Sequence, residues 1–173
     1  MLDYRITPRE KFDDRIGELV SMLELTRNVT LQEISNLSQD DLDFLATNTS
    51  NSIGALLSHI ASIEFVHQII SFEERDLNES ELAEWRTALE LGEKGRKDIN
   101  NQPLDYYVNN LTQVRERTLT YLEFKNDSWL FKEHQWENDV SYNHYYLWFH
   151  VMEDEINHRG QIRTIKRVLK NNK

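Results

Sequence analysis

The amino-acid sequence predicts an all-α protein that folds as a four-helix bundle. Residues that interrupt helices are scarce, since the chain of 173 residues contains only 5 glycines and 2 prolines. Four long segments repeat apolar residues at spacings of three and four, the period of a helix that buries one face. Long connections join these segments, which is typical of a bundle with short additional elements. We expect residues 1–173 to form a single domain.

The first long helix is expected from about Arg9 to Asn28, and a short helical turn follows it. The face predicted to be buried consists of Phe12, Ile16, Leu19, Val20 and Leu23. In the segment LSQDD, Ser38 and Asp41 have the spacing of a capping box, in which two side chains satisfy the first backbone N–H groups of a helix. This pattern predicts that a helical turn begins there.

The second long helix is predicted from Ile53 to about Phe72, because Asn51 and Ser52 are good N-cap residues. Its broad apolar face consists of Ile53, Leu56, Leu57, Ile60, Ile63, Val66 and Ile70. A shorter and more exposed helix is expected in SELAEWRTALELG, and Gly92 is expected to end it. The next segment, GEKGRKDINNQP, is predicted to be a loop.

Pro103 is expected to open the third long helix, which continues to about Phe124. Residues 125–142 lack a helical period and their aromatic residues alternate loosely, which indicates a structured loop or a short hairpin. The last long helix is expected to begin near Asn143. Its apolar stripe consists of Leu147, Val151, Ile162, Ile165 and Leu169.

The composition excludes several classes of protein. A formal charge of −10 argues against a nucleic-acid partner, because binding to phosphates requires a basic surface. The chain has no cysteine, which excludes disulfides and cysteine-based metal sites and fits a cytoplasmic location. The polar N-terminal segment does not have the pattern of a signal peptide, and no membrane partner is expected because no apolar run approaches a membrane span.

Asp154 and His158 interrupt the apolar stripe of the last helix, one turn apart. At this spacing two side chains can converge on one ion. His59 lies at the edge of the apolar face of the second helix, so the three residues can meet if these two helices pack together. Two imidazoles and a carboxylate are the ligands of an open divalent metal site.

Two alternatives stay open for these residues. Asp154 and His158 could form a buried hydrogen-bonded pair without a metal, and the histidine of the second helix could be an ordinary core residue. A ferritin-like di-iron centre is a further alternative, because residues 64–67 and 155–158 both have the pattern E-x-x-H. The di-iron interpretation ranks low, since the first and third helices place no carboxylate on their apolar faces.

Two separated motifs resemble the DinB superfamily of DinB/YfiT-like metalloenzymes, and especially its DUF664-like branch. These motifs are NSIGALLSHIASIE at residues 51–64 and HVMEDEINHRGQI at residues 150–162. They occur in the same order and at a fitting distance, and the likeness covers nearly the whole chain.

The resemblance implies a bundle with up-down-down-up topology and a metal site that is usually built from three histidines. His59 matches the ligand of the second helix and His158 matches the last ligand, whereas Asp154 stands at the middle position. An anionic ligand makes the site harder, so the expected ion is divalent Ni, Zn, Mn or Fe. Glu64 and His150 are expected to support the ligands through hydrogen bonds.

Relatives of this kind include thiol-S-transferases that use low-molecular-weight thiols such as bacillithiol or mycothiol. The resemblance therefore implies a metal-dependent thiol-S-transferase or hydrolase whose partners are a thiol and a small-molecule electrophile. It also implies a homodimer. Trp129, Trp136 and Trp148 are candidates for the wall of a pocket near the site. The alternative is a non-catalytic bundle, stress-related or partner-binding, in which the metal site has lapsed.

Overall fold

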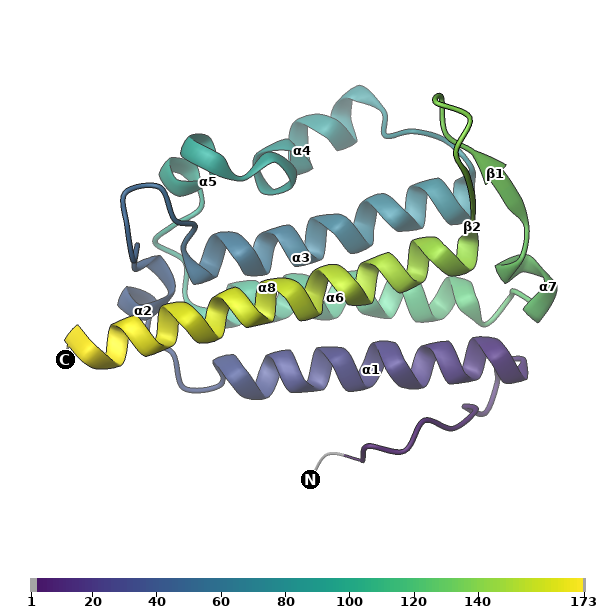
Figure 1. The fold of residues 1–173 in the computed structure, drawn as a ribbon, viewed down its shortest axis with the longest axis horizontal. Coiled ribbons are helices and arrows are strands. Elements are labelled where there is room, and N and C mark those ends of the chain that lie inside the picture. The colour runs from purple at the N-terminus through teal and green to yellow at the C-terminus, as the bar shows by residue number, and fades with distance from the viewer. Residues whose placement is uncertain (1–2, 173) are drawn as a thin grey trace.

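The computed structural model describes residues 3–172, and four long helices form its body (Figure 1). These helices are α1 (Asp14–Ile34), α3 (Ile53–Gln68), α6 (Leu104–Leu122) and α8 (His144–Asn172). Helices α1 and α8 run in one direction, and α3 and α6 run in the other, which is the predicted up-down-down-up topology. Helix α3 packs against α6 and α8, and α1 packs against α8 and α6. The prediction of an all-α bundle is confirmed.

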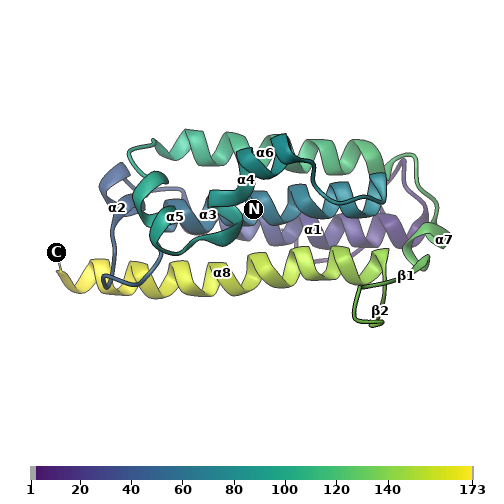
Figure 2. The ribbon, with the colours of Figure 1, turned by 90° about the horizontal axis from the view of Figure 1, so that it is seen from above.

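Short elements connect the long helices. They are α2 (Gln39–Asp43), η1 (Ile69–Glu73), α4 (Glu79–Glu90), α5 (Gly92–Asp98), α7 (Asp127–Leu130), β1 (Glu133–Gln135) and β2 (Ser141–Asn143). Helices α4 and α5 lie in the long crossover that joins the parallel helices α3 and α6, and α7 and the two strands lie at the end of the bundle where α8 begins (Figure 2). Both groups of short elements contribute to the candidate sites described below.

Local capping explains where several of these helices begin. Ser38 and Asp41 form the predicted capping box at the start of α2. The Ser52 hydroxyl accepts a hydrogen bond from the backbone N–H of Ala55 at 3.1 Å, which starts α3 at the predicted residue. These caps depend on side chains within four residues, so the sequence alone reveals them.

The first helix differs from the prediction at both ends. It begins at Asp14 rather than near Arg9, and it continues six residues beyond Asn28 to Ile34. The carboxylate of Asp127 accepts hydrogen bonds from the backbone N–H groups of residues 15 and 16 at 3.1 Å, so α7 caps the start of α1. A cap supplied from more than a hundred residues away leaves no local signal.

The segment predicted as the loop GEKGRKDINNQP contains a helix, so that prediction was wrong for residues 92–98. Leu91, which separates α4 from α5, and Gly92, the first residue of α5, both have positive φ angles, 53° and 67°. Residues 125–142 contain the predicted hairpin, with His134 opposite Tyr142 in the antiparallel pair. They also contain α7, which the sequence did not indicate.

The apolar core forms two clusters along the bundle. One cluster joins α3, α6 and the C-terminal half of α8, and the other joins α1, the start of α8 and α7. In the first cluster Gly54 lets α3 approach α6 closely, since a Cβ atom there would lie 2.5 Å from the hydroxyl of the buried Tyr107. Most residues predicted to face the core do so, and those of α1 that are fully enclosed are Ile16, Leu19, Val20 and Leu23. Val66 and Ile70, which were also predicted to face the core, are only partly buried and belong to neither cluster.

Four buried charged residues lie between the long helices. Arg27 of α1 and Arg115 of α6 pair with Glu64 of α3 and Glu155 of α8, and we call these four residues the ionic layer. Both carboxylates are fully buried. The remaining N–H groups of the arginines donate to the carbonyls of Leu111 and Leu23 at 2.6 Å. The layer is electrically balanced and ties all four long helices together.

Within the described residues, one helical stretch is long and apolar enough to cross a membrane, and it is Ile53–Glu73. In its most apolar window 78% of the residues are buried inside the bundle. This stretch is therefore mostly buried, as a core helix of the bundle is.

Candidate metal centre

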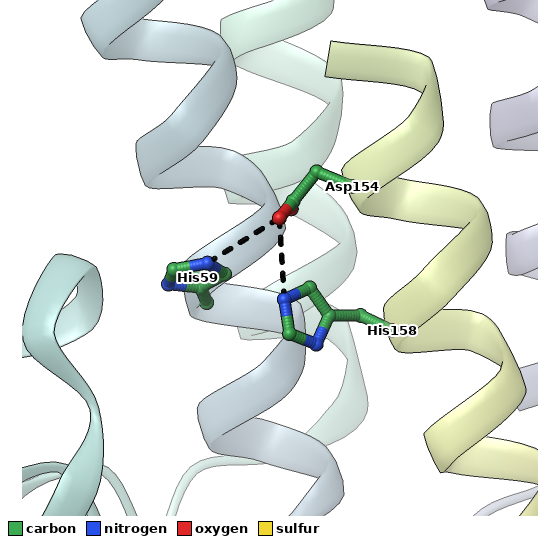
Figure 3. Close-up of side chains that lie close together, drawn as sticks. All are labelled: His59, Asp154 and His158. Atoms are coloured by element: carbon green, nitrogen blue, oxygen red, sulfur yellow. Dashed lines mark ion pairs between the residues drawn. The ribbon is translucent and has the colours of Figure 1, made fainter. Parts of the chain in front are cut away.

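His59, Asp154 and His158 converge between α3 and α8, as predicted (Figure 3). One ligand atom of each side chain lies within 4.8 Å of those of the other two. The Nε2 atoms of His59 and His158 lie 3.6 and 3.3 Å from the same oxygen, Oδ1 of Asp154. The three side chains are only 11–12% exposed, so the cluster is largely shielded from water.

A backbone carbonyl fixes the orientation of the His59 ring. Nδ1 of His59 lies 2.9 Å from the carbonyl oxygen of Ala88 in α4, and a carbonyl can only accept, so Nδ1 carries the proton. In the neutral ring the Nε2 lone pair therefore points toward the Asp154 carboxylate. Two acceptors that face each other repel unless a proton or a cation lies between them.

The charges at the cluster are strongly coupled. Burial raises the pKa of Asp154, but the nearby imidazoles of His158 and His59 outweigh it and hold that pKa well below its usual range. Burial lowers the pKa of His59, but the Asp154 carboxylate, together with backbone hydrogen bonding at Ala88 and Leu89, raises it by more. The carboxylate is therefore an anion at neutral pH, and it favours a positive charge beside it.

The spacing of the donor atoms fits a metal ion. Metal–ligand bonds of about 2.0–2.2 Å at tetrahedral angles place neighbouring ligand atoms roughly 3.3–3.6 Å apart. The two nitrogen–oxygen distances of 3.3 and 3.6 Å fall in that range and are long for hydrogen bonds. In addition, Oδ2 of Asp154 and Nδ1 of His158 are buried without a hydrogen-bond partner among residues 3–172. The residues present therefore fit a divalent ion.

Comparison with known proteins places this chain in a family. The family model of mycothiol-S-transferase matches residues 18–170, which include α3, α6, most of α1 and α8, and the three candidate ligands. The chain belongs to the mycothiol-S-transferase family. This family is DinB/YfiT-like, so the resemblance noted from the two sequence motifs is confirmed.

A solved structure supports the fold. The conserved protein of a locus from Enterococcus faecalis is similar to this family member with a TM-score of 0.67 and 15% sequence identity. The match covers 88% of this chain and 95% of that chain. At this identity the similarity concerns the fold alone. No match was found among the curated proteins.

Glu64, which was expected to support the ligands, instead belongs to the ionic layer. Its oxygens accept from Arg27, Arg115 and the hydroxyl of Thr118 at 2.7–3.0 Å. Burial raises the pKa of Glu64, but the two arginines outweigh it and lower this pKa to about 2. In the described part of the chain Glu64 makes no hydrogen bond to a candidate ligand.

The ionic layer also explains why the two E-x-x-H patterns do not make a di-iron centre. A ferritin-like site needs a carboxylate from each of the other two helices. Here those helices contribute Arg27 and Arg115, whose guanidinium groups bind both glutamates. Two cations therefore occupy the place where bridging carboxylates would be required.

His150 and the tryptophans lie apart from the three ligands. His150 is half-buried, with Nδ1 3.3 Å from Glu153, and it makes no hydrogen bond to a candidate ligand in the described residues. Trp148 is fully buried in the core, Trp129 stacks on Phe72, and Trp136 stacks on Tyr142 of the hairpin. The partner that holds a ligand in place is the Ala88 carbonyl, which the sequence did not reveal because backbone atoms carry no sequence signature.

His67 in α3 predicts how stability depends on pH. Burial lowers the pKa of His67 to about 4, whereas an exposed histidine has a pKa of about 6.5. The unfolded chain therefore binds more protons between these values, and the free energy of unfolding should fall as the pH falls, by about 1.4 kcal/mol per pH unit for this residue. In the metal-free protein, His67→Gln should reduce the slope measured by urea denaturation. An unchanged slope in His67→Gln would contradict the assignment of this pH dependence to the buried His67.

Proposed function

We propose that this protein is a cytoplasmic, metal-dependent thiol S-transferase that binds one divalent ion through His59, Asp154 and His158. The observation that supports the proposal is the convergence of two imidazole nitrogens on one carboxylate oxygen at metal-ligand spacing. The proposed ion is Ni, Zn, Mn or Fe, and the proposed thiol is mycothiol or a related low-molecular-weight thiol such as bacillithiol. We also propose that the protein forms a homodimer. Light scattering during size-exclusion chromatography measures the molecular mass, which should be that of two chains.

The residues have distinct roles in this proposal. A divalent ion bound here would supply Lewis-acid chemistry that lowers the pKa of a thiol or a water molecule. The Ala88 carbonyl keeps the proton on Nδ1 of His59, so that Nε2 is available as a ligand. Asp154 supplies the negative charge that holds a cation between two neutral rings. Because the three side chains are largely enclosed, few molecules of bulk water can compete with the thiol for the ion.

A cleft on the surface of α8 offers room for a polar thiol. It has a volume of about 550 Å³ and lies between the loop before α3 and the exposed face of α8. Its wall includes Asn51, Asn157 and Thr164, whose side chains can donate and accept hydrogen bonds.

A conjugation assay tests the proposed reaction. Tag-free protein is stripped of metal, loaded with Zn²⁺, Ni²⁺, Mn²⁺ or Fe²⁺, and mixed with an alkyl halide and either mycothiol or bacillithiol. In the expected reaction the thiol sulfur bonds to the alkyl carbon, the halide leaves, and the thiol proton passes to the solvent. Mass spectrometry should detect the thioether at a rate that requires both metal and thiol, and His158→Ala should reduce it to the rate without protein.

The controls separate this proposal from its alternatives. His150→Ala changes a histidine outside the site and should retain the activity. A product in which water rather than the thiol has replaced the halide would assign a hydrolase. Metal binding without conjugation of either thiol would instead support the non-catalytic bundle, and the absence of metal binding would reject the site.

A further inference from the structure

A second group of metal-ligating side chains lies at the end of the bundle where α8 begins. It consists of Glu74, which follows η1, His134 in β1, and His144, the first residue of α8. One ligand atom of each residue lies within 4.8 Å of those of the other two. The two histidine rings have centroids 4.7 Å apart. Three elements that are distant in the sequence thus place two imidazoles and a carboxylate together.

The nitrogens of the two histidines show which atoms are available. Nδ1 of His144 lies 2.9 Å from the carbonyl oxygen of Trp129, so Nδ1 donates and Nε2 carries the lone pair of the neutral ring. His144 is fully buried, and its Nε2 atom has no hydrogen-bond partner among the described residues. Nε2 of His134 is also buried without a partner in this part of the chain. A buried polar atom without a partner is destabilising, so two of them in one cluster require an explanation.

The hydrogen bond from His144 to a carbonyl is itself typical of metal sites. A histidine that binds a metal usually donates its other N–H to a carbonyl or a carboxylate, which fixes the tautomer and the direction of the ring. The Trp129 carbonyl does this for His144. The antiparallel pairing of β1 and β2 sets the position of His134, directly opposite Tyr142.

The cluster borders open space on one side. A cleft of about 610 Å³ lies beside the hairpin, and Glu74, His134 and Tyr142 line it. A fourth coordination position could therefore be filled by water from this cleft, as in metal sites with three protein ligands. Lys132 currently pairs with the Glu74 carboxylate, so a metal ion would compete with this exposed lysine for one oxygen. An exposed ion pair of this kind contributes little to stability, and a metal–ligand bond readily exceeds its contribution.

We propose that Glu74, His134 and His144 form a second site for a divalent transition-metal ion. The ion that we expect these ligands to bind is Zn²⁺. Two histidines and a glutamate are an established ligand set for zinc. An ion bound there would join the hairpin to the end of η1 and the start of α8, and would satisfy both unpartnered nitrogens. This site shares no residue with the site of the proposed function.

Zinc stoichiometry tests the second site separately from the first. The full chain is purified without a tag, stripped of metal, dialysed against Zn²⁺, and analysed for zinc per chain. We expect two ions in the wild type, one in His158→Ala, and none in His158→Ala combined with His134→Ala. In the His158→Ala background Co²⁺ should give the absorption of a tetrahedral complex, and the additional His134→Ala change should remove that absorption.

Control variants keep the test independent of folding and of the first site. His150→Ala should still bind two ions, and Lys132→Ala should bind zinc more tightly at the second site because it frees the Glu74 carboxylate. Zn²⁺ should raise the Tm of His158→Ala but not that of the double variant. Equal zinc content in His158→Ala and the double variant would overturn the proposal. If instead the first site fails, the wild type binds one ion, which His134→Ala removes and His158→Ala does not.

Discussion

Arg115→Met should lower the free energy of unfolding by about 3–5 kcal/mol, because it leaves the ionic layer with one uncompensated buried charge. Arg115 is 6% exposed, and its guanidinium donates to both oxygens of Glu64 at 2.7 and 3.0 Å. Methionine retains the apolar stem of the side chain, so the loss reports the missing charge rather than a large cavity. Urea denaturation at neutral pH measures the effect.

Two controls separate a buried charge from other causes. Arg86→Ala removes an ion pair in which both side chains are 57% exposed, and it should change the free energy of unfolding by less than about 1 kcal/mol. Combining Arg115→Met with Glu64→Gln removes the charge that was left unpaired and should recover part of the loss. If Arg115→Met lowered the free energy of unfolding by less than about 1 kcal/mol, the charge of Arg115 would not be needed to compensate the buried carboxylates of the ionic layer.

Asp154→Asn should weaken binding of a divalent ion at the first site by about a hundredfold or more. The substitution keeps the shape of the side chain but removes the only anionic ligand, whose single oxygen faces both histidines. Calorimetric titration with Zn²⁺ and Mn²⁺ measures the affinities, and a His134→Ala background excludes the second proposed site. Glu153→Gln, at the exposed neighbouring residue, is the matched control.

Asp154→His would give the site the three histidines that the DinB resemblance implies. That variant should retain Zn²⁺ binding but lose affinity for Mn²⁺ relative to Zn²⁺, since imidazole is the softer ligand and carboxylate suits Mn²⁺. An unchanged preference between the two ions would indicate that Asp154 is not a ligand.

The sequence singles out Asp154 and His158 because they are polar groups in an apolar stripe. The structure brings these two residues together with His59. The same signal was present for Arg27, which follows Leu23 by four residues on the face of α1, and for Arg115, which follows Leu111 on α6. We did not predict the burial of these arginines, because an isolated arginine on a helix usually extends its charged end into water.

Other features could not be predicted because their partners are distant in the sequence. Asp127 caps α1 across more than a hundred residues, and Glu74 meets His134 and His144 only after the hairpin has folded over the end of the bundle. Helix α5 was missed since the segment GEKGRKD is rich in charge and glycine, which is typical of loops. Periodicity reports which residues face a core, but it does not report which distant residues satisfy a polar group.

The hydrogen bond between His59 and Ala88 has a consequence for how this protein could diverge. The acceptor belongs to α4, which lies in the crossover and outside the four long helices (Figure 1). A small shift of α4 would rotate the His59 ring and change the basicity of its free nitrogen without altering any candidate ligand. Substitutions in the crossover, where the core imposes few constraints, therefore offer a route by which related proteins could acquire different metal preferences while the bundle stays the same.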